Sequence, residues 1–98
     1  MASSLKTAQF LIESRLGDAA CGDVQAYLDL GMVYSSGAEG TAIDLIEAHK
    51  WFNLAALKGD DRAQECRAEI AGEMSAREIV EAQKQARAWL HLTSARAA

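Results

Sequence analysis

The chain has 98 residues, a formal net charge of −4, and apolar residues at half of its positions, so it can form one small domain with a single core. The acidic balance argues against a nucleic-acid partner, because such a protein needs a clustered basic face. No apolar stretch approaches the length that crosses a bilayer, and the first residues do not resemble a signal peptide. We therefore expect a cytoplasmic protein that binds neither nucleic acid nor membrane.

Apolar residues recur at helical rather than strand spacing, and the chain contains no proline, so the sequence predicts an all-α fold. The expected helices cover residues 4–16, 23–37, 42–58, 60–72 and 75–92, followed by a frayed tail at 93–98. Gly17 is expected to end the first helix, and Asp23 to cap the second. Gly31 interrupts the second helix at a cost of about 1 kcal/mol relative to alanine, which predicts a close helix–helix crossing at that point.

The third expected helix is apolar around nearly its whole circumference. Ile43, Ile46, Leu54 and Leu57 lie on one side of it, and Leu45, Ala48, Phe52, Ala55 and Ala56 lie on the other. A helix of this kind is buried between layers, so it should form the centre of the domain.

Hydroxyl and acidic residues mark the expected starts of the last three helices. Thr41 and Asp44 show capping spacing before the third helix, and Ser75 with Glu78 forms a capping box before the fifth. Asp60 or Asp61 should cap the fourth helix.

A short segment of the chain is repeated. Gly22-Asp23-Val24-Gln25-Ala26 recurs 37 positions later as Gly59-Asp60-Asp61-Arg62-Ala63. The second copy then loses its large core residues, which is typical of a terminal repeat.

Small and aromatic residues stand at fixed offsets across the second and third helices. They are Ala26, Leu30, Gly31, Tyr34, Gly37, Ala48, Trp51, Phe52, Ala55, Ala56 and Gly59. This pattern resembles the Sel-one-like repeat, a family of helical hairpins related to the tetratricopeptide repeat. Arrays in that family usually hold several repeats, whereas this chain has about one and a half, and its two cysteines do not reproduce the spacing of the cysteine-rich members.

The resemblance implies a short α-solenoid of stacked hairpins within a single domain, residues 1–98. Residues 1–21 would form an N-terminal helix, residues 22–59 one complete repeat, and residues 60–92 a degenerate capping hairpin. It also implies an adaptor-like role with no catalytic residue and no cofactor.

The residues that could carry chemistry have simpler explanations. Cys21, His49, Cys66 and His91 show no metal-ligand spacing. Cys21 precedes a helix and has no base near it in sequence, so we interpret it as a small residue at a tight turn, and both cysteines as reduced thiols. Tyr34, Trp51, Phe52 and Trp89 are expected to fill the core rather than form a ligand cage.

Gln25, Asp29, Met32 and Ser36 form a stripe beside the core face of the second helix. In hairpin-stack proteins the first helix of each unit tends to line the concave side, so this stripe is our candidate partner-binding surface. The resulting hypothesis is a non-catalytic protein-interaction module with an unidentified protein partner. The alternatives are a self-assembling homodimer, whose formation would protect the exposed ends of a short stack, and a ligand-binding or enzymatic domain with a deep polar pocket.

Overall fold

The computed structural model describes the backbone of residues 2–97 and the side chains of residues 9–38 and 40–94. Over that range the chain is all-α, as predicted. Its elements are α1 (Ala2–Ala20), α2 (Val24–Ser36), the short 3-10 helix η1 (Ala38–Gly40), α3 (Leu45–Leu57), α4 (Asp61–Ala71) and α5 (Ala76–Ala97). None of the described helices combines the length and the apolar character that crossing a membrane requires.

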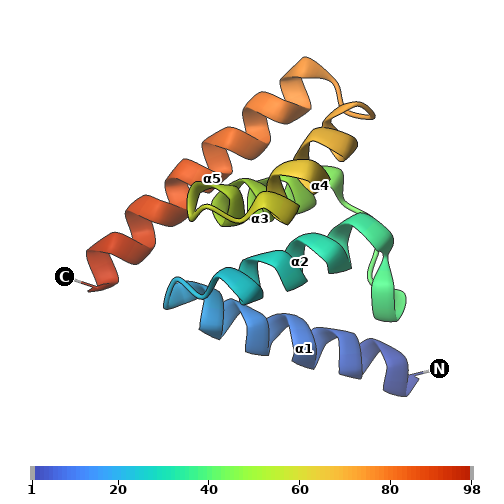
Figure 1. Ribbon diagram of the computed structural model, residues 1–98. Coiled ribbons are helices and arrows are strands. Elements are labelled where there is room, and N and C mark those ends of the chain that lie inside the picture. The colour runs from blue at the N-terminus through green and yellow to red at the C-terminus, as the bar shows by residue number, and fades with distance from the viewer. Residues whose placement is uncertain (1, 98) are drawn as a thin grey trace.

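Helix α3 occupies the centre of the fold, which confirms the prediction from its apolar circumference. It packs against α2, α4 and α5, whereas α1 packs against α2 and η1. In Figure 1 the first four helices run back and forth across the view, and α5 runs diagonally past α3, on the side away from α1 and α2. Helix α5 packs mainly against α3 rather than α4, so α4 and α5 diverge from the short turn that joins them.

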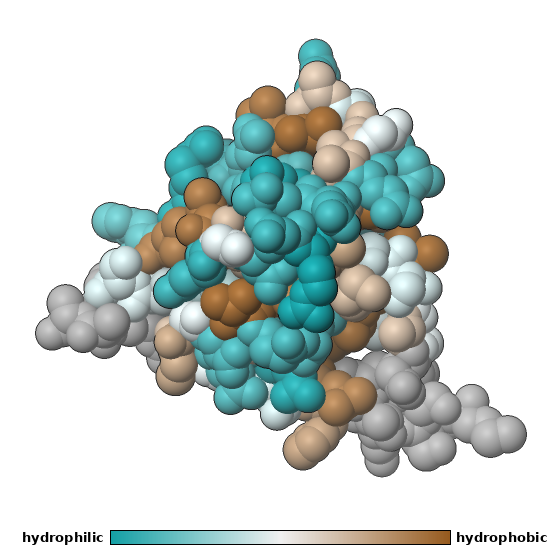
Figure 2. Space-filling model, in the orientation of Figure 1, coloured by the Kyte–Doolittle hydropathy of each residue, from teal (hydrophilic) through white to brown (hydrophobic). Residues whose placement is uncertain are grey.

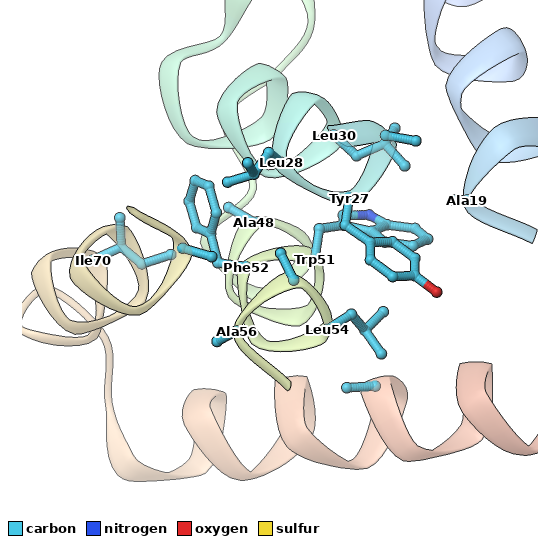
Figure 3. Close-up of a cluster of buried hydrophobic side chains, with 14 residues drawn as sticks. Ala19, Tyr27, Leu28, Leu30, Ala48, Trp51, Phe52, Leu54, Ala56 and Ile70 are labelled. Atoms are coloured by element: carbon cyan, nitrogen blue, oxygen red, sulfur yellow. The ribbon is translucent and has the colours of Figure 1, made fainter. Parts of the chain in front are cut away.

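The core is organised around Trp51, which is 1% exposed. Its ring stacks on Tyr27 of α2 at a centroid distance of 6.0 Å and meets the edge of Trp89 of α5 at 4.9 Å. The indole N–H donates a hydrogen bond to Glu47 Oε2 at 3.1 Å, so its polar atom is satisfied inside the helix. Figure 3 shows Tyr27 and Trp51 side by side between α2 and α3. We did not predict Tyr27 as a core residue, although it is fully buried.

Gly31 lies directly against the ring of Phe52. A Cβ atom at this position would lie 2.5–2.9 Å from three ring carbons, which is closer than van der Waals contact allows. The close crossing predicted from the interior glycine is therefore confirmed, and it lies between α2 and α3.

The start of α2 repeats at the start of α4, 37 residues later. Gly22 and Gly59 both adopt left-handed φ, at 83° and 93°, and the aspartate that follows each of them is the N-cap of the next helix. The backbone hydrogen bonds correspond as well: Gly22 N–H donates to Ala19 O at 2.9 Å, and Gly59 N–H donates to Ala56 O at 2.9 Å. The sequence repeat is thus a repeat of local structure.

This turn explains why the predicted end of the first helix was wrong. Gly17 has a helical conformation and α1 continues to Ala20. The positive φ that ends a helix of this kind belongs to Gly22 instead. The turns that follow α1 and α3 therefore have the same conformation, with a positive-φ glycine in each.

The cap prediction for the third helix was also wrong. Asp44 is the N-cap of α3 and accepts a hydrogen bond from Glu47 N–H at 3.1 Å. Thr41 makes no capping bond, and its hydroxyl is buried without a partner. Because the helix starts at Leu45, Ile43 lies outside it and is 63% exposed, and Leu57 at the other end is also 63% exposed. Both residues were expected to be buried, and neither is part of the core.

The other helix boundaries follow the prediction more closely. Asp60 caps α4 by accepting from Ala63 N–H at 3.0 Å. Ser75 and Glu78 exchange both bonds of a capping box. Helix α5 continues past Leu92 to Ala97, so the segment expected to fray is helical that far, and Ala98 lies outside the described residues.

Two glycine substitutions should have opposite effects on stability. Gly31→Ala forces a methyl group into the Phe52 ring and should lower the free energy of unfolding by about 1–3 kcal/mol. Gly17→Ala places a methyl group where no atom lies within 4 Å, inside a helix, and should raise stability by about 0.5–1 kcal/mol. Urea unfolding of both variants measures the difference. A stabilising Gly31→Ala would show that the crossing is not this tight.

Candidate functional site

An open hollow lies between α2 and α4, which we call the α2/α4 groove. Its volume is about 340 Å³, and it is lined by Gln25, Leu28, Asp29, Met32, Arg62, Glu65 and Cys66. Three of the four residues predicted to bind a partner therefore lie in one groove. The fourth, Ser36, is exposed one turn further along α2 and does not line it; its hydroxyl donates to Met32 O at 2.7 Å.

The apolar part of the groove is held by the core beneath it. Leu28 is buried and belongs to the same cluster as Phe52 and Ile70, and Figure 3 shows these side chains meeting between α2, α3 and α4. Met32 is 52% exposed although it is large and apolar. A rigid apolar base with one exposed methionine is a typical contact surface for a partner.

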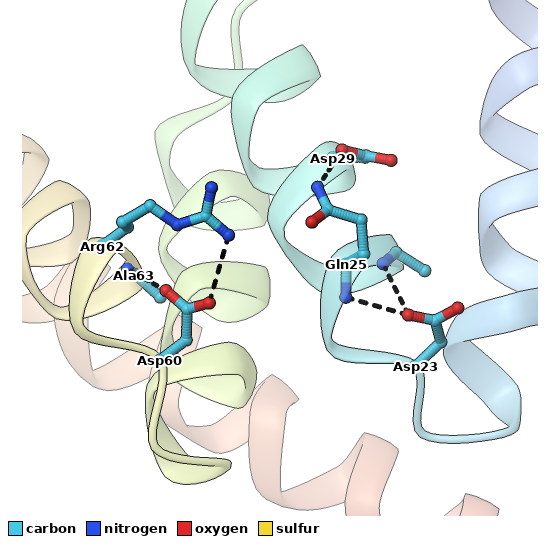
Figure 4. A network of polar contacts seen from close by, with 7 residues as sticks. Asp23, Gln25, Asp29, Asp60, Arg62 and Ala63 are labelled. Carbon is cyan, nitrogen blue, oxygen red and sulfur yellow. Dashed lines mark hydrogen bonds and ion pairs between the residues drawn. The ribbon is translucent and has the colours of Figure 1, made fainter.

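Two of the charged groups in the groove are paired within the protein. Asp29 Oδ1 accepts from Gln25 Nε2 at 2.9 Å, and its Oδ2 lies 2.8 Å from Arg15 Nε of α1. Arg62 Nη2 lies 3.4 Å from Asp60 Oδ2. Figure 4 shows Gln25 with Asp29 on α2, and Arg62 with Asp60 at the start of α4. Glu65 is exposed and has no ion-pair partner among the described residues.

Cys66 is a half-buried free thiol on the α4 side of the groove. Burial raises its pKa, and the carboxylates of Glu69 and Glu65 raise it further. The thiol therefore stays protonated at neutral pH, whereas a nucleophilic cysteine needs a thiolate. Cys21 is exposed in the turn before α2 and is also free.

His49 is buried on α3, at 3% exposure. Its Nδ1 has no hydrogen-bond partner. Burial lowers its pKa, and the nearby Arg67 of α4, whose Nη1 donates to Asn53 Oδ1 at 2.6 Å, lowers it further. The imidazole is therefore neutral in the folded protein near pH 7, and the unfolded chain binds a proton more readily.

Stability should depend on pH through His49. Because the folded pKa lies below the ordinary value of 6.5, the free energy of unfolding should fall as the pH drops through 6.5, by at most about 1.4 kcal/mol per pH unit. Urea unfolding at several pH values should show this slope in the wild type and in the control His91→Gln, and a weaker slope in His49→Gln. Equal slopes in all three proteins would contradict it.

A second hollow of about 340 Å³ lies on the other side of Met32, between α1, α2 and η1. It is lined by Leu11, Ile12, Arg15, Asp29, Leu30, Met32, Val33 and Ala38. Most of this lining is apolar, and the paired Arg15 and Asp29 are its charged groups. Met32 thus lies on a ridge of α2 between two hollows. In the orientation of Figure 1, Figure 2 shows a largely hydrophilic face in which small apolar patches lie between polar side chains.

The residues that carried the family resemblance are mostly structural. Ala26, Leu30, Gly31, Ala48, Trp51, Phe52, Ala55 and Ala56 are buried, Tyr34 and Gly37 are half-buried, and Gly59 is exposed in its turn. Among the described residues, no group of three or more His, Cys, Asp or Glu side chains could hold a metal ion.

No family model matches the chain, and neither a curated protein nor a solved structure matches it. A function for this chain therefore has to be argued from the groove and the helices that form it.

Proposed function

We propose that this protein is a small, non-catalytic protein-interaction module of the Sel-one-like type. In this proposal its helices form a short solenoid of stacked hairpins, and the α2/α4 groove receives a segment of a partner protein. The observation that carries the proposal is the groove itself: Met32 remains half-exposed above a buried apolar base, between side chains contributed by two different helices. Such a combination of apolar centre and polar edge is typical of contact surfaces.

The recurring turn supports the solenoid part of the proposal. Two glycine–aspartate turns start α2 and α4 with the same backbone hydrogen bonds, and residues of both helices line one groove. A stack of hairpins would place the first helix of each unit on one common surface, which is where the groove lies.

The arrangement of charges favours a protein surface over a small-molecule site. A ligand pocket needs several polar groups that converge on its interior. Asp29 and Arg62 are instead paired along the groove with Arg15, Gln25 and Asp60. The groove is therefore better suited to side chains of a partner that bury Met32 and Leu28.

Site-specific photocrosslinking tests the proposed function. The photoreactive residue p-benzoylphenylalanine, placed at Met32, should form a discrete adduct with a partner protein when the protein is irradiated in its native cells. The control is the same residue at Val80, which is similarly exposed at 59% but lies on α5. No adduct from position 32, or the same adducts from both positions, would contradict the proposal.

A further inference from the structure

The two helices that form the groove carry more acidic than basic residues. From Asp23 to the end of α2 and from Asp60 to the end of α4 there are six carboxylates and two arginines. The carboxylates are Asp23, Asp29, Asp60, Asp61, Glu65 and Glu69. Both arginines are engaged within the protein, Arg62 with Asp60 and Arg67 with Asn53 of α3.

Two of these carboxylates, Glu65 and Glu69, have no ion-pair partner among the described residues and lie on the α4 side of the groove. Glu65 lines the groove, and Glu69 follows one helical turn later on α4. Both are exposed. Burial raises the pKa of the neighbouring Cys66 thiol, and both carboxylates raise it further. An occupant of the groove would therefore meet negative charge along the α4 edge.

We propose that the α2/α4 groove binds a short basic segment of a partner protein, with one long apolar side chain placed among Leu28, Met32 and Cys66. Lysine or arginine residues flanking that side chain would lie beside Glu65 and Glu69. This inference rests on the proposed function and specifies the chemistry of the partner.

Charge complementarity selects this occupant over an acidic one. The carboxylate of Asp29 is already matched by Arg15, whereas Glu65 and Glu69 offer unmatched charge to a cation. An acidic segment would place like charges together, at a cost that opposes binding. The hollow of about 340 Å³ accepts side chains rather than a whole helix, so a short segment is sufficient.

The competing occupant is a second copy of the same chain. Helix α5 carries the exposed cations Arg77, Lys84 and Arg87 together with the exposed Val80, with Glu81 among them. Sedimentation velocity of the wild-type protein alone separates the two possibilities. Our proposal expects a monomer at the concentrations used for binding. Oligomers that disappear on reversal of Glu65 and Glu69 would overturn it in favour of self-association.

A displayed library of random 12-residue peptides supplies the probe. Peptides are selected on the wild-type protein and counter-selected on Met32→Arg, with thermal unfolding used to verify that the variant folds. The expected sequences carry a net positive charge around at least one leucine, methionine or phenylalanine. Enrichment of acidic or uncharged sequences would overturn the inference.

The selected peptide is then measured against two doubly substituted proteins with the same change in net charge. Glu65→Lys/Glu69→Lys should weaken binding about tenfold or more, because two attractive contacts become repulsive. The control Glu13→Lys/Glu73→Lys, which reverses exposed charges outside the groove lining, should change it little. Equal weakening by both variants would indicate a general charge effect and overturn the inference.

Alkylation provides an independent footprint within the same molecule. The reaction is run at a pH alkaline enough for Cys66 of the free protein to react with iodoacetamide, and a peptide bound in the groove should then slow the alkylation of Cys66 and leave that of the exposed Cys21 unchanged. Binding without protection of Cys66 would place the peptide elsewhere and overturn the inference. If photocrosslinking from position 32 captures a partner through a segment that is not basic, the inference fails and the proposed function stands. If position 32 gives no adduct, both fail.

Discussion

The contact between the Phe52 ring and the backbone of Gly31 is the constraint on which the rest of the structure depends. With no Cβ at position 31, the ring can lie directly against α2. That close approach brings Tyr27 of α2 onto Trp51 of α3, and Trp51 in turn meets Trp89 of α5. The packing of three of the five helices thus depends on one position where a side chain would not fit. The base of the α2/α4 groove also follows from it, because Leu28 packs in the same cluster as Phe52.

Much of the fold could be predicted because it depends on local signals. Asp23, Asp60 and the Ser75–Glu78 pair act within one helical turn, so their capping roles follow from spacing alone. Gly17 misled the prediction because glycine lowers helix propensity without forbidding a helix, and the turn that ends α1 is made at Gly22. Tyr27 and Ile43 were misjudged for a different reason. Their burial depends on where α3 begins and on which helix packs against it. The local sequence around either residue determines neither of these features.

The candidate site was half predictable for the same reason. The α2 side of the groove follows from helical periodicity, which places Gln25, Asp29 and Met32 on one stripe. The α4 side depends on which helices are neighbours in space, and Glu65 and Cys66 carried no signal that could pair them with that stripe. The one usable clue was the repeat. If both copies of the glycine–aspartate turn start equivalent helices, then α2 and α4 are expected to lie on the same side of the stack.

That correspondence also explains the second hollow. In the repeat, Leu11, Arg15 and Val33 correspond to Ala48, Phe52 and Ile70, each 37 positions later. Helix α2 packs on α3, with Gly31 against the Phe52 ring, and Ala48, Phe52 and Ile70 share one buried cluster with Leu28 (Figure 3). Their counterparts Leu11, Arg15 and Val33 line the hollow between α1 and α2, where no described helix takes the corresponding place.

Phe52 and its counterpart Arg15 differ in side chain because their surroundings differ. Phe52 needs a glycine opposite it, whereas Arg15 turns to Asp29 of α2 at 2.8 Å. A large apolar ring there would border the open hollow between α1 and α2, whereas an ion pair tolerates water. Phe52 and Arg15 therefore differ in chemistry because Phe52 packs against a neighbouring helix and Arg15 borders a hollow.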